Sequence, residues 1–200
     1  MILWLGSAPL IEALQIADRL TLEEIECFDP EFIISFGYRH ILLPEIVDKY
    51  ACINLHIAYL PWNRGADPNL WSIIDGTPKG ISIHYMDAGL DTGDLICQQE
   101  VAFSPDDTLR TSYEKLQTAM RNLFLCRWPF IKAGKAPRYR QEGIGSYHRS
   151  DDKDMWPRIM PDGWDTPIAF VENFVIDTEL SNGFIEQYRS ECHNNCKMEN

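Results

Sequence analysis

Residues 31–56 read EFIISFGYRHILLPEIVDKYACINLH, and their pattern indicates the architecture of the chain. Glu31–Gly37 is a β-branched and aromatic run that ends in glycine, which predicts a buried strand. Pro44–Tyr50 begins with proline, which is common in a first helical turn, and predicts a short helix. Cys52–His56 is a second apolar run and predicts a second strand. A strand, a helix and a strand in this order indicate an α/β fold.

The same alternation continues on both sides of this stretch. Ile2–Gly6 predicts a first strand, Pro9–Leu20 has helical spacing, and Thr21–Glu24 is a capping-type start for one more short turn. Further elements are expected downstream: a helix holding Leu70, Trp71, Ile73 and Ile74, strands at Ile81–Met86 and Leu95–Phe103, and a long helix at Thr108–Ala133 capped by Ser104–Asp107. The apolar stripe of the long helix predicts a core-facing side made of Leu109, Tyr113, Leu116, Met120, Leu123 and Phe124.

These elements predict a shortened Rossmann-like fold, with a largely parallel sheet and flanking helices. We expect residues 1–134 to form the main domain. Residues 135–200 are rich in Trp, Tyr, Pro and Gly and predict a small aromatic-rich C-terminal appendage of loops and short strands.

The composition limits the partners of the protein. Its 18 basic and 30 acidic residues give a formal net charge of −12, whereas nucleic-acid binding requires clustered Lys and Arg. No nucleic-acid partner is therefore expected. No apolar run is long enough to cross a bilayer, and Met1–Gly6 carries no basic leader, so we expect no membrane partner and a cytoplasmic location. A homodimer remains open.

The six cysteines fit a reducing compartment. Cys27, Cys52, Cys97 and Cys126 are scattered, which is typical of reduced thiols rather than of a disulfide framework. Cys192, His193 and Cys196 could imitate a metal cluster, but they stand at unusual spacing in a polar tail. We interpret them as a frayed tail and expect no metal site.

Two polar side chains alternate in the last strand of the opening stretch. Asn54 and His56 leave the same face of Cys52–His56, and ligands of α/β sheets bind near the carboxyl ends of strands. A glycine-bent turn at residues 87–94 then supplies carboxylates between two strands. Taken alone, Asn-x-His is a weak signal, and a structural histidine is the better explanation of it.

The order of the motifs is more specific than any one of them. Asn54-Leu55-His56 is followed by Leu60-Pro61, by Arg64-Gly65 and by the run IHYMDAGLDTGDLI at residues 83–96. This series closely resembles the core of the formyltransferases that use 10-formyltetrahydrofolate, over about residues 30–103. That family includes enzymes acting on Met-tRNA, on glycinamide ribonucleotide and on amino sugars.

The resemblance implies a catalytic trio and a formyl donor. Asn54 and His56 match the Asn-x-His motif of the family, and Asp91 matches the Asp of its Leu-Asp-x-Gly turn. The implied chemistry is direct attack of an amine on the formyl carbon of 10-formyltetrahydrofolate. Asn54 and His56 would donate hydrogen bonds to the formyl oxygen as it gains negative charge. Asp91 would orient His56 and accept the proton of the amine, directly or through water.

The resemblance also implies where the folate lies. In the family the pterin is held largely by main-chain groups, which correspond here to three short segments. The implied cofactor-binding residues are Arg39, His40, Ile41, Leu42, Tyr59, Leu60, Pro61, Asp87, Ala88, Gly89 and Leu90. For Ile41 and Leu42, burial in the core is an equally simple interpretation. His84 lies in the middle of a strand, and we expect it to be structural.

The acceptor is expected to be a small-molecule amine, most simply a nucleotide-linked amino sugar. An acidic chain disfavours tRNA, and no glycine-rich phosphate loop follows the first strand, which disfavours glycinamide ribonucleotide. Tyr147, in Tyr147-His148-Arg149, is similar to tail segments of sugar N-formyltransferases and is a candidate for contacting the acceptor. Arg64 and Asp67 could also contact the acceptor, or they could only hold their turn in place.

Two further alternatives stay open. The acceptor could be Met-tRNA or glycinamide ribonucleotide despite the charge, or the protein could be a non-catalytic relative that binds folate or a nucleotide sugar. The segment between Leu5 and Phe32 is short for this family, which suggests that one or two βα units are missing from the sheet.

Overall fold

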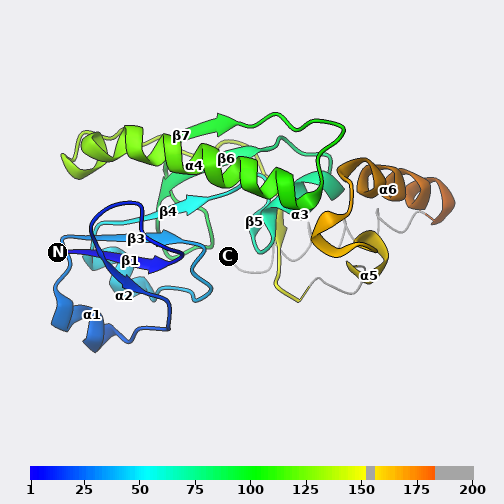
Figure 1. Cartoon of the computed structure of the whole chain (residues 1–200). Coiled ribbons are helices and arrows are strands. Elements are labelled where there is room, and N and C mark those ends of the chain that lie inside the picture. The colour runs from blue at the N-terminus through cyan, green and yellow to red at the C-terminus, as the bar shows by residue number, and fades with distance from the viewer. Residues whose placement is uncertain (152–155, 183–200) are drawn as a thin grey trace.

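The computed structural model describes residues 1–151 and 156–182, and its centre is a six-stranded sheet (Figure 1). The strand order is β2-β1-β3-β4-β6-β7. The first four strands in this order run parallel, whereas β6 and β7 run antiparallel to their neighbours. The strands are β1 (Ile2–Gly6), β2 (Leu14–Ile16), β3 (Phe32–Phe36), β4 (Cys52–His56), β6 (Gly80–Tyr85) and β7 (Leu95–Glu100). The predicted Rossmann-like, largely parallel sheet with flanking helices is confirmed.

Helices lie on both faces of this sheet. Figure 1 shows α4 running along one face and α1 and α2 lying on the other. A second, two-stranded sheet pairs β5 (Arg64–Gly65) with β8 (Tyr147–His148). The helices are α1 (Leu22–Phe28), α2 (Pro44–Lys49), α3 (Pro68–Ile74), α4 (Leu109–Lys132), α5 (Trp156–Ile159) and α6 (Ile168–Asn182), with a 3-10 turn at Gly163–Asp165. No helix in the described part of the chain is long and apolar enough to cross a membrane.

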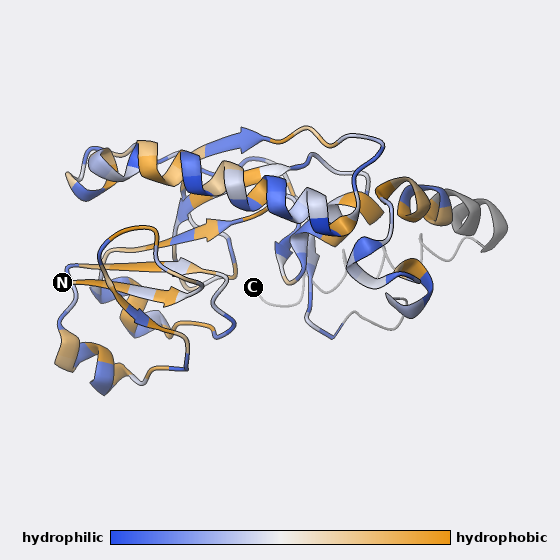
Figure 2. Ribbon diagram, viewed as in Figure 1, coloured by the Kyte–Doolittle hydropathy of each residue, from blue (hydrophilic) through white to orange (hydrophobic). Residues whose placement is uncertain are grey.

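Alternation along the strands divides the core between the two faces. Ile53 and Leu55 of β4 pack against Met120 and Phe124 of α4, whereas Cys52 packs with Ile46 of α2. This is the two-residue period expected of a strand that is covered on both sides. Figure 2 shows β1 and β3 as almost continuously apolar, while apolar and polar residues alternate along α4. The apolar content of the central strands therefore comes from burial on both faces.

Local sequence signals account for several helix boundaries. Thr21 accepts a hydrogen bond from the Glu24 N–H, and the Glu24 carboxylate accepts one from the Thr21 N–H, which makes a capping box at the start of α1. Pro44 occupies the first turn of α2, as predicted.

The prediction of helical structure over Pro9–Leu20 was wrong. Leu14–Ile16 forms β2, which pairs in parallel with Leu3–Leu5 of β1. The exposed edge of β1 offers unpaired backbone groups, and pairing with them outweighs the helical spacing of a short segment. One short strand and one helix therefore connect β1 to β3.

Two details of the long helix differ from the prediction. Its N-cap is Thr108, whose hydroxyl accepts from the Thr111 N–H while the Thr111 hydroxyl accepts from the Thr108 N–H, so Ser104–Asp107 precedes the cap. Asp107 instead binds the Ser104 N–H and Lys115. Tyr113 is 38% exposed and does not belong to the buried stripe, because α4 turns that position toward the solvent.

The described residues after 134 include two helices, α5 and α6, where the sequence predicted only loops and short strands. Val171 and Val175 of α6 pack against Leu70 and Ile74 of α3 in a separate apolar cluster. Only β8 forms a strand among the described residues after 134. The apolar pattern of a short segment does not distinguish a strand from a buried helix, which explains why these helices were not predicted.

Candidate functional site

The site begins with the pairing of two strands. Asn54 of β4 lies opposite His84 of β6, and His56 lies opposite Ser82. All four side chains leave the same sheet face, because their neighbours Ile53, Leu55, Ile81 and Ile83 point into the core under α4. Asn54 and His56 therefore share a face, as predicted, and the pairing adds His84 to them.

Asp91 is brought onto this face by the loop that joins β6 to β7. Its backbone is left-handed, with φ 54°, a conformation that Asp tolerates better than most residues. Asp87 shapes the loop, since its side chain accepts hydrogen bonds from the Gly89 N–H and the Thr92 hydroxyl. The Asp91 side chain is buried as a result, although the preceding residues 87–90 are exposed.

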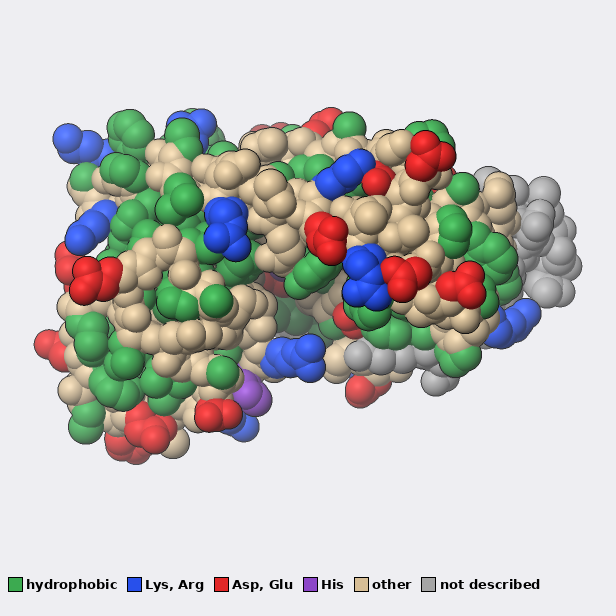
Figure 3. Space-filling model, in the orientation of Figure 1, with side chains coloured by type: hydrophobic (Ala, Val, Ile, Leu, Met, Phe, Trp, Pro, Cys, Tyr) green, Lys and Arg blue, Asp and Glu red, His purple; other side chains and the backbone are tan. Residues whose placement is uncertain are grey.

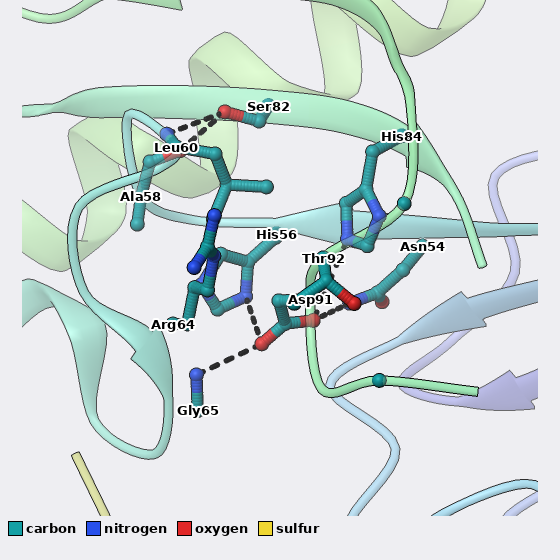
Figure 4. A network of polar contacts seen from close by, with 12 residues as sticks. Asn54, His56, Ala58, Leu60, Arg64, Gly65, Ser82, His84, Asp91 and Thr92 are labelled. Carbon is teal, nitrogen blue, oxygen red and sulfur yellow. Dashed lines mark hydrogen bonds and ion pairs between the residues drawn. The ribbon is translucent and has the colours of Figure 1, made fainter. Parts of the chain in front are cut away.

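The Asp91 carboxylate contacts four groups (Figure 4). Oδ1 accepts a hydrogen bond of 2.9 Å from the Asn54 amide and lies 3.4 Å from His84 Nε2. Oδ2 accepts a hydrogen bond of 2.8 Å from the Gly65 N–H and lies 3.7 Å from His56 Nδ1. The predicted trio of Asn54, His56 and Asp91 thus lies in one cluster.

Both histidines have acceptors on their two sides. His56 Nε2 lies 2.9 Å from the Asn63 carbonyl, and His84 Nδ1 lies 2.8 Å from the Tyr85 carbonyl. A carbonyl only accepts, so these nitrogens carry hydrogen, and the second nitrogen of each ring faces Asp91. The cluster therefore sets two imidazole rings beside one buried carboxylate.

The electrostatics of Asp91 follow from these contacts. Burial alone raises the pKa of its carboxyl, because desolvation penalises the charged form. The nearby His56 and His84, together with the Gly65 N–H, outweigh burial and hold the pKa of Asp91 well below its ordinary value. Asp91 is therefore a carboxylate across the physiological pH range.

A second network fixes the turn that follows His56. The Ser82 hydroxyl donates to the Ala58 carbonyl and accepts from the Leu60 N–H (Figure 4). The Gln98 amide donates to the Ser82 hydroxyl and to the Leu60 carbonyl. The peptide bond between Leu60 and Pro61 is cis. This network fixes the turn that precedes Asn63, and the Asn63 carbonyl lies 2.9 Å from His56 Nε2.

The residues predicted to hold a folate lie in three segments with different exposure. Ile41 is 73% exposed and Leu90 is 38% exposed, whereas Leu42 is buried among core residues of the α1 and α2 face. Arg39, His40, Asp87, Ala88 and Gly89 are exposed, Leu60 is buried, and Tyr59 and Pro61 are half-buried. For Ile41 the core interpretation is thereby excluded. Exposed apolar side chains at Ile41 and Leu90 suit the binding of an aromatic ligand.

The candidate acceptor residues lie around the two-stranded sheet. The Arg64 guanidinium donates two hydrogen bonds to the Gln141 side chain. Asp67 occupies the N-cap position of α3 with a left-handed backbone. Tyr147 is half-buried on β8, beside Gly65. Arg64 therefore has a partner within the protein, whatever else it contacts.

Sequence reasoning missed three contributors to this cluster. His84 was expected to be structural, yet it is 1% exposed and points at Asp91. Its alternation with Ile81 and Ile83 could have placed His84 on the sheet face opposite the core, but its position beside Asn54 depends on the register of β4 and β6. The Gly65 N–H and the Gln141 side chain carried no comparable signal, since their roles depend on tertiary contacts.

No metal site accompanies the cluster in the described part of the chain. No group of three or more His, Cys, Asp or Glu side chains there could hold a metal ion. Cys192, His193 and Cys196 lie outside the described residues.

Comparisons with known proteins point to one family. Residues 7–127 match the family model described as formyl transferase. This match covers more than half of the chain and includes Asn54, His56 and Asp91.

Solved structures share the fold. The formyltransferase PseJ from Anoxybacillus kamchatkensis, solved with UDP-4,6-dideoxy-4-formamido-L-AltNAc and tetrahydrofolate, is 44% identical and superposes with a TM-score of 0.81. The match covers 85% of this chain and 96% of that one. A 4-N formyltransferase from Francisella tularensis is 27% identical, with a TM-score of 0.63, over 70% of this chain and 57% of that one.

Curated sequences are also similar to this chain. The Met-tRNA formyltransferase of Pelotomaculum thermopropionicum is 35% identical over 161 residues, which cover 77% of this chain and 51% of that protein. The enzyme of the same name from Clostridium botulinum is 36% identical, over 69% of this chain and 46% of that protein. The chain thus spans about half the length of these curated relatives.

Proposed function

The chain belongs to the formyl transferase family, and we propose that it transfers a formyl group from 10-formyltetrahydrofolate to the amine of a nucleotide-linked amino sugar. The observation that carries the proposal is the cluster in which Asp91 meets both Asn54 and His56. The likeness to the Anoxybacillus enzyme, over 96% of that chain, supports a sugar as the acceptor.

The proposed reaction uses each group of the cluster differently. A free amine attacks the formyl carbon, and negative charge develops on the formyl oxygen. Asn54 has two amide hydrogens and gives one to Asp91, so the second is available for that oxygen. His56 Nε2 bonds to the Asn63 carbonyl and Nδ1 lies 3.7 Å from Asp91, so in the proposed reaction His56 supports the Asp91 carboxylate.

Asp91 is the proposed acceptor for the proton of the attacking amine. Each Asp91 oxygen accepts one hydrogen bond, from Asn54 or from Gly65, and its other acceptor site faces His84 Nε2 at 3.4 Å or His56 Nδ1 at 3.7 Å, beyond ordinary hydrogen-bond length. Asp91 can therefore take the proton directly or through water, while the carbon–nitrogen bond to the folate breaks and that nitrogen gains a proton. The new carbon–nitrogen bond makes the product a formamide, without a formyl-enzyme.

Surface charge supports a small acceptor. On the face that Figure 3 shows, Lys and Arg side chains are dispersed among Asp and Glu rather than gathered into one patch. A nucleotide sugar needs only a few cationic or donor groups for its phosphates. Arg138, Arg140 and Arg149 are candidates for this role in addition to Arg64. The 4-formamido sugar bound in the Anoxybacillus structure suggests a UDP-linked 4-amino-4,6-dideoxy sugar as the first acceptor to try.

Met-tRNA is the second candidate acceptor, because the curated relatives carry that name. Separate assays with each acceptor distinguish the two candidates. The protein is mixed with 10-formyltetrahydrofolate and either the UDP-linked amino sugar, its 4-hydroxyl analogue or Met-tRNA, and tetrahydrofolate release is followed.

We expect kcat/KM for the amino sugar to exceed that for Met-tRNA by about 100-fold or more, a difference of roughly 3 kcal/mol in transition-state binding. The hydroxyl analogue should give no product. Faster formylation of Met-tRNA would overturn the proposed acceptor. If the protein binds 10-formyltetrahydrofolate but releases no tetrahydrofolate with any amine, the protein is a non-catalytic relative.

The pH profile of the reaction tests the assignment of Asp91. Because its pKa is held below the ordinary value, Asp91 stays ionised as the pH falls through the range where amines become protonated. The acidic limb of kcat/KM should therefore follow the amine of the acceptor. Two acceptors with different amine pKa values should give limbs displaced by that difference. An acidic limb that stays fixed for both acceptors would contradict this assignment.

A further inference from the structure

The segment from Tyr139 to His148 runs back to the site from the end of α4. Tyr139 exchanges two backbone hydrogen bonds with Leu95, of 2.7 and 2.9 Å, where β7 begins. At the other end, Ser146 and His148 bond through the backbone to the residues around β5. The segment thereby connects the two pieces of chain that meet at Asp91, which are the loop before β7 and the turn at Gly65.

Gln141 lies between these anchors and contacts both pieces. Its side-chain amide donates to the carbonyl of Asp91 at 2.8 Å and to that of Gly93 at 2.9 Å. Its side-chain oxygen accepts from Arg64 Nη2 at 2.7 Å and from Arg64 Nε at 3.2 Å. One side chain therefore joins the Asp91 loop to β5.

The chemistry of these contacts matches an amide and no other side chain of this size. Two carbonyls require two N–H donors, and the guanidinium requires an acceptor. A glutamate has the same shape and could still accept from Arg64. It would place an acceptor against the carbonyls of Asp91 and Gly93, which would leave them unpaired and repelled.

The loop needs such support because its conformation is unusual. Asp91 has a left-handed backbone, and its side chain must reach both Asn54 and the Gly65 N–H. Non-glycine residues adopt that backbone at a cost and keep it where surrounding contacts impose it. We propose that Gln141 is a positioning residue, which holds the Asp91 carboxylate at Asn54, His56 and Gly65 for the proposed formyl transfer.

The kinetic test compares Gln141→Glu with Gln15→Ala. Gln15 also donates its amide to a backbone carbonyl, that of Gly6, but it lies on the edge strand β2. Gln141→Glu should lower kcat about 10- to 100-fold, as small misplacements of reacting groups do, with KM values for both substrates within about threefold. Gln15→Ala should leave both parameters unchanged. A wild-type kcat for Gln141→Glu would overturn the proposal.

A double-mutant cycle separates positioning from general support of the fold. If Gln141 acts through Asp91, Gln141→Glu should change the residual kcat of Asp91→Asn by no more than about twofold. The same loss of activity in both backgrounds would show that Gln141 supports the fold in general, and would contradict the proposal.

Hydrogen exchange of the Gly65 amide provides a measurement that does not depend on the reaction. That amide is bonded to Asp91 Oδ2, so it should exchange at least about tenfold faster in Gln141→Glu, as local opening becomes easier. Exchange at the wild-type rate would overturn the inference about Gln141. Faster exchange in a protein whose wild type transfers no formyl group would instead overturn only the proposed function.

Discussion

Replacing Asp91 with asparagine is expected to lower kcat by about 100-fold or more. The asparagine side chain can accept from Asn54 or from the Gly65 N–H with its one oxygen, so its NH2 group meets the other donor. His56 and His84 also lose the negative charge that they face. The variant therefore loses the proton acceptor and the order of the groups around it.

Asp106→Asn is the matched control, since it removes an exposed carboxylate in the connection between β7 and α4. It should keep the wild-type kcat. Steady-state rates are to be compared after circular dichroism has shown both variants to be folded. Turnover near the wild-type rate in folded Asp91→Asn would remove Asp91 from the proposed mechanism.

The second large effect is expected at Gly65, where the backbone itself contacts Asp91. Gly65 has φ 89°, and an added Cβ would lie 2.3 Å from the His148 carbonyl oxygen. Gly65→Ala should therefore separate β5 from β8 and weaken the hydrogen bond from its N–H to Asp91. We expect a destabilisation of about 2–4 kcal/mol from strain and the clash, together with a loss of kcat of about tenfold or more.

Gly76→Ala provides the control for backbone strain alone. Gly76 has φ 62°, but nothing lies within 4 Å of an added Cβ. It should cost only about 1–2 kcal/mol, with unchanged kcat in the folded fraction. Urea denaturation and kinetics on both variants give the comparison. Equal losses of kcat for Gly65→Ala and Gly76→Ala would contradict a specific link between Gly65 and Asp91.

The sequence predicted the parts of the fold that depend on local pattern. The strands β3 and β4 and the helix α2 follow from apolar runs, a glycine stop and a proline at the first turn. β2 could not be predicted in this way, because Leu14–Ile16 becomes a strand only by pairing with the edge of β1. The helices after residue 155 likewise depend on packing against α3.

The candidate site could also be predicted only in part from the sequence. The parity of β4 predicts that Asn54 and His56 share a face, and the family motif adds Asp91. The proximity of His84 requires the register between β4 and β6, which one sequence does not reveal. Gln141 lies 50 positions from Asp91, so its contact becomes visible only when the segment after α4 is placed in space.

The central claim is that this site moves a formyl group from a folate to an amine. Its most direct test is to supply 10-formyltetrahydrofolate labelled with ¹³C at the formyl carbon, together with the UDP-linked 4-amino sugar, and to follow the label by NMR. We expect the label to appear as a formamide on the sugar, at a rate that Asp91→Asn lowers about 100-fold or more. Label that is released as free formate, or that reaches the sugar equally fast with Asp91→Asn, would contradict it.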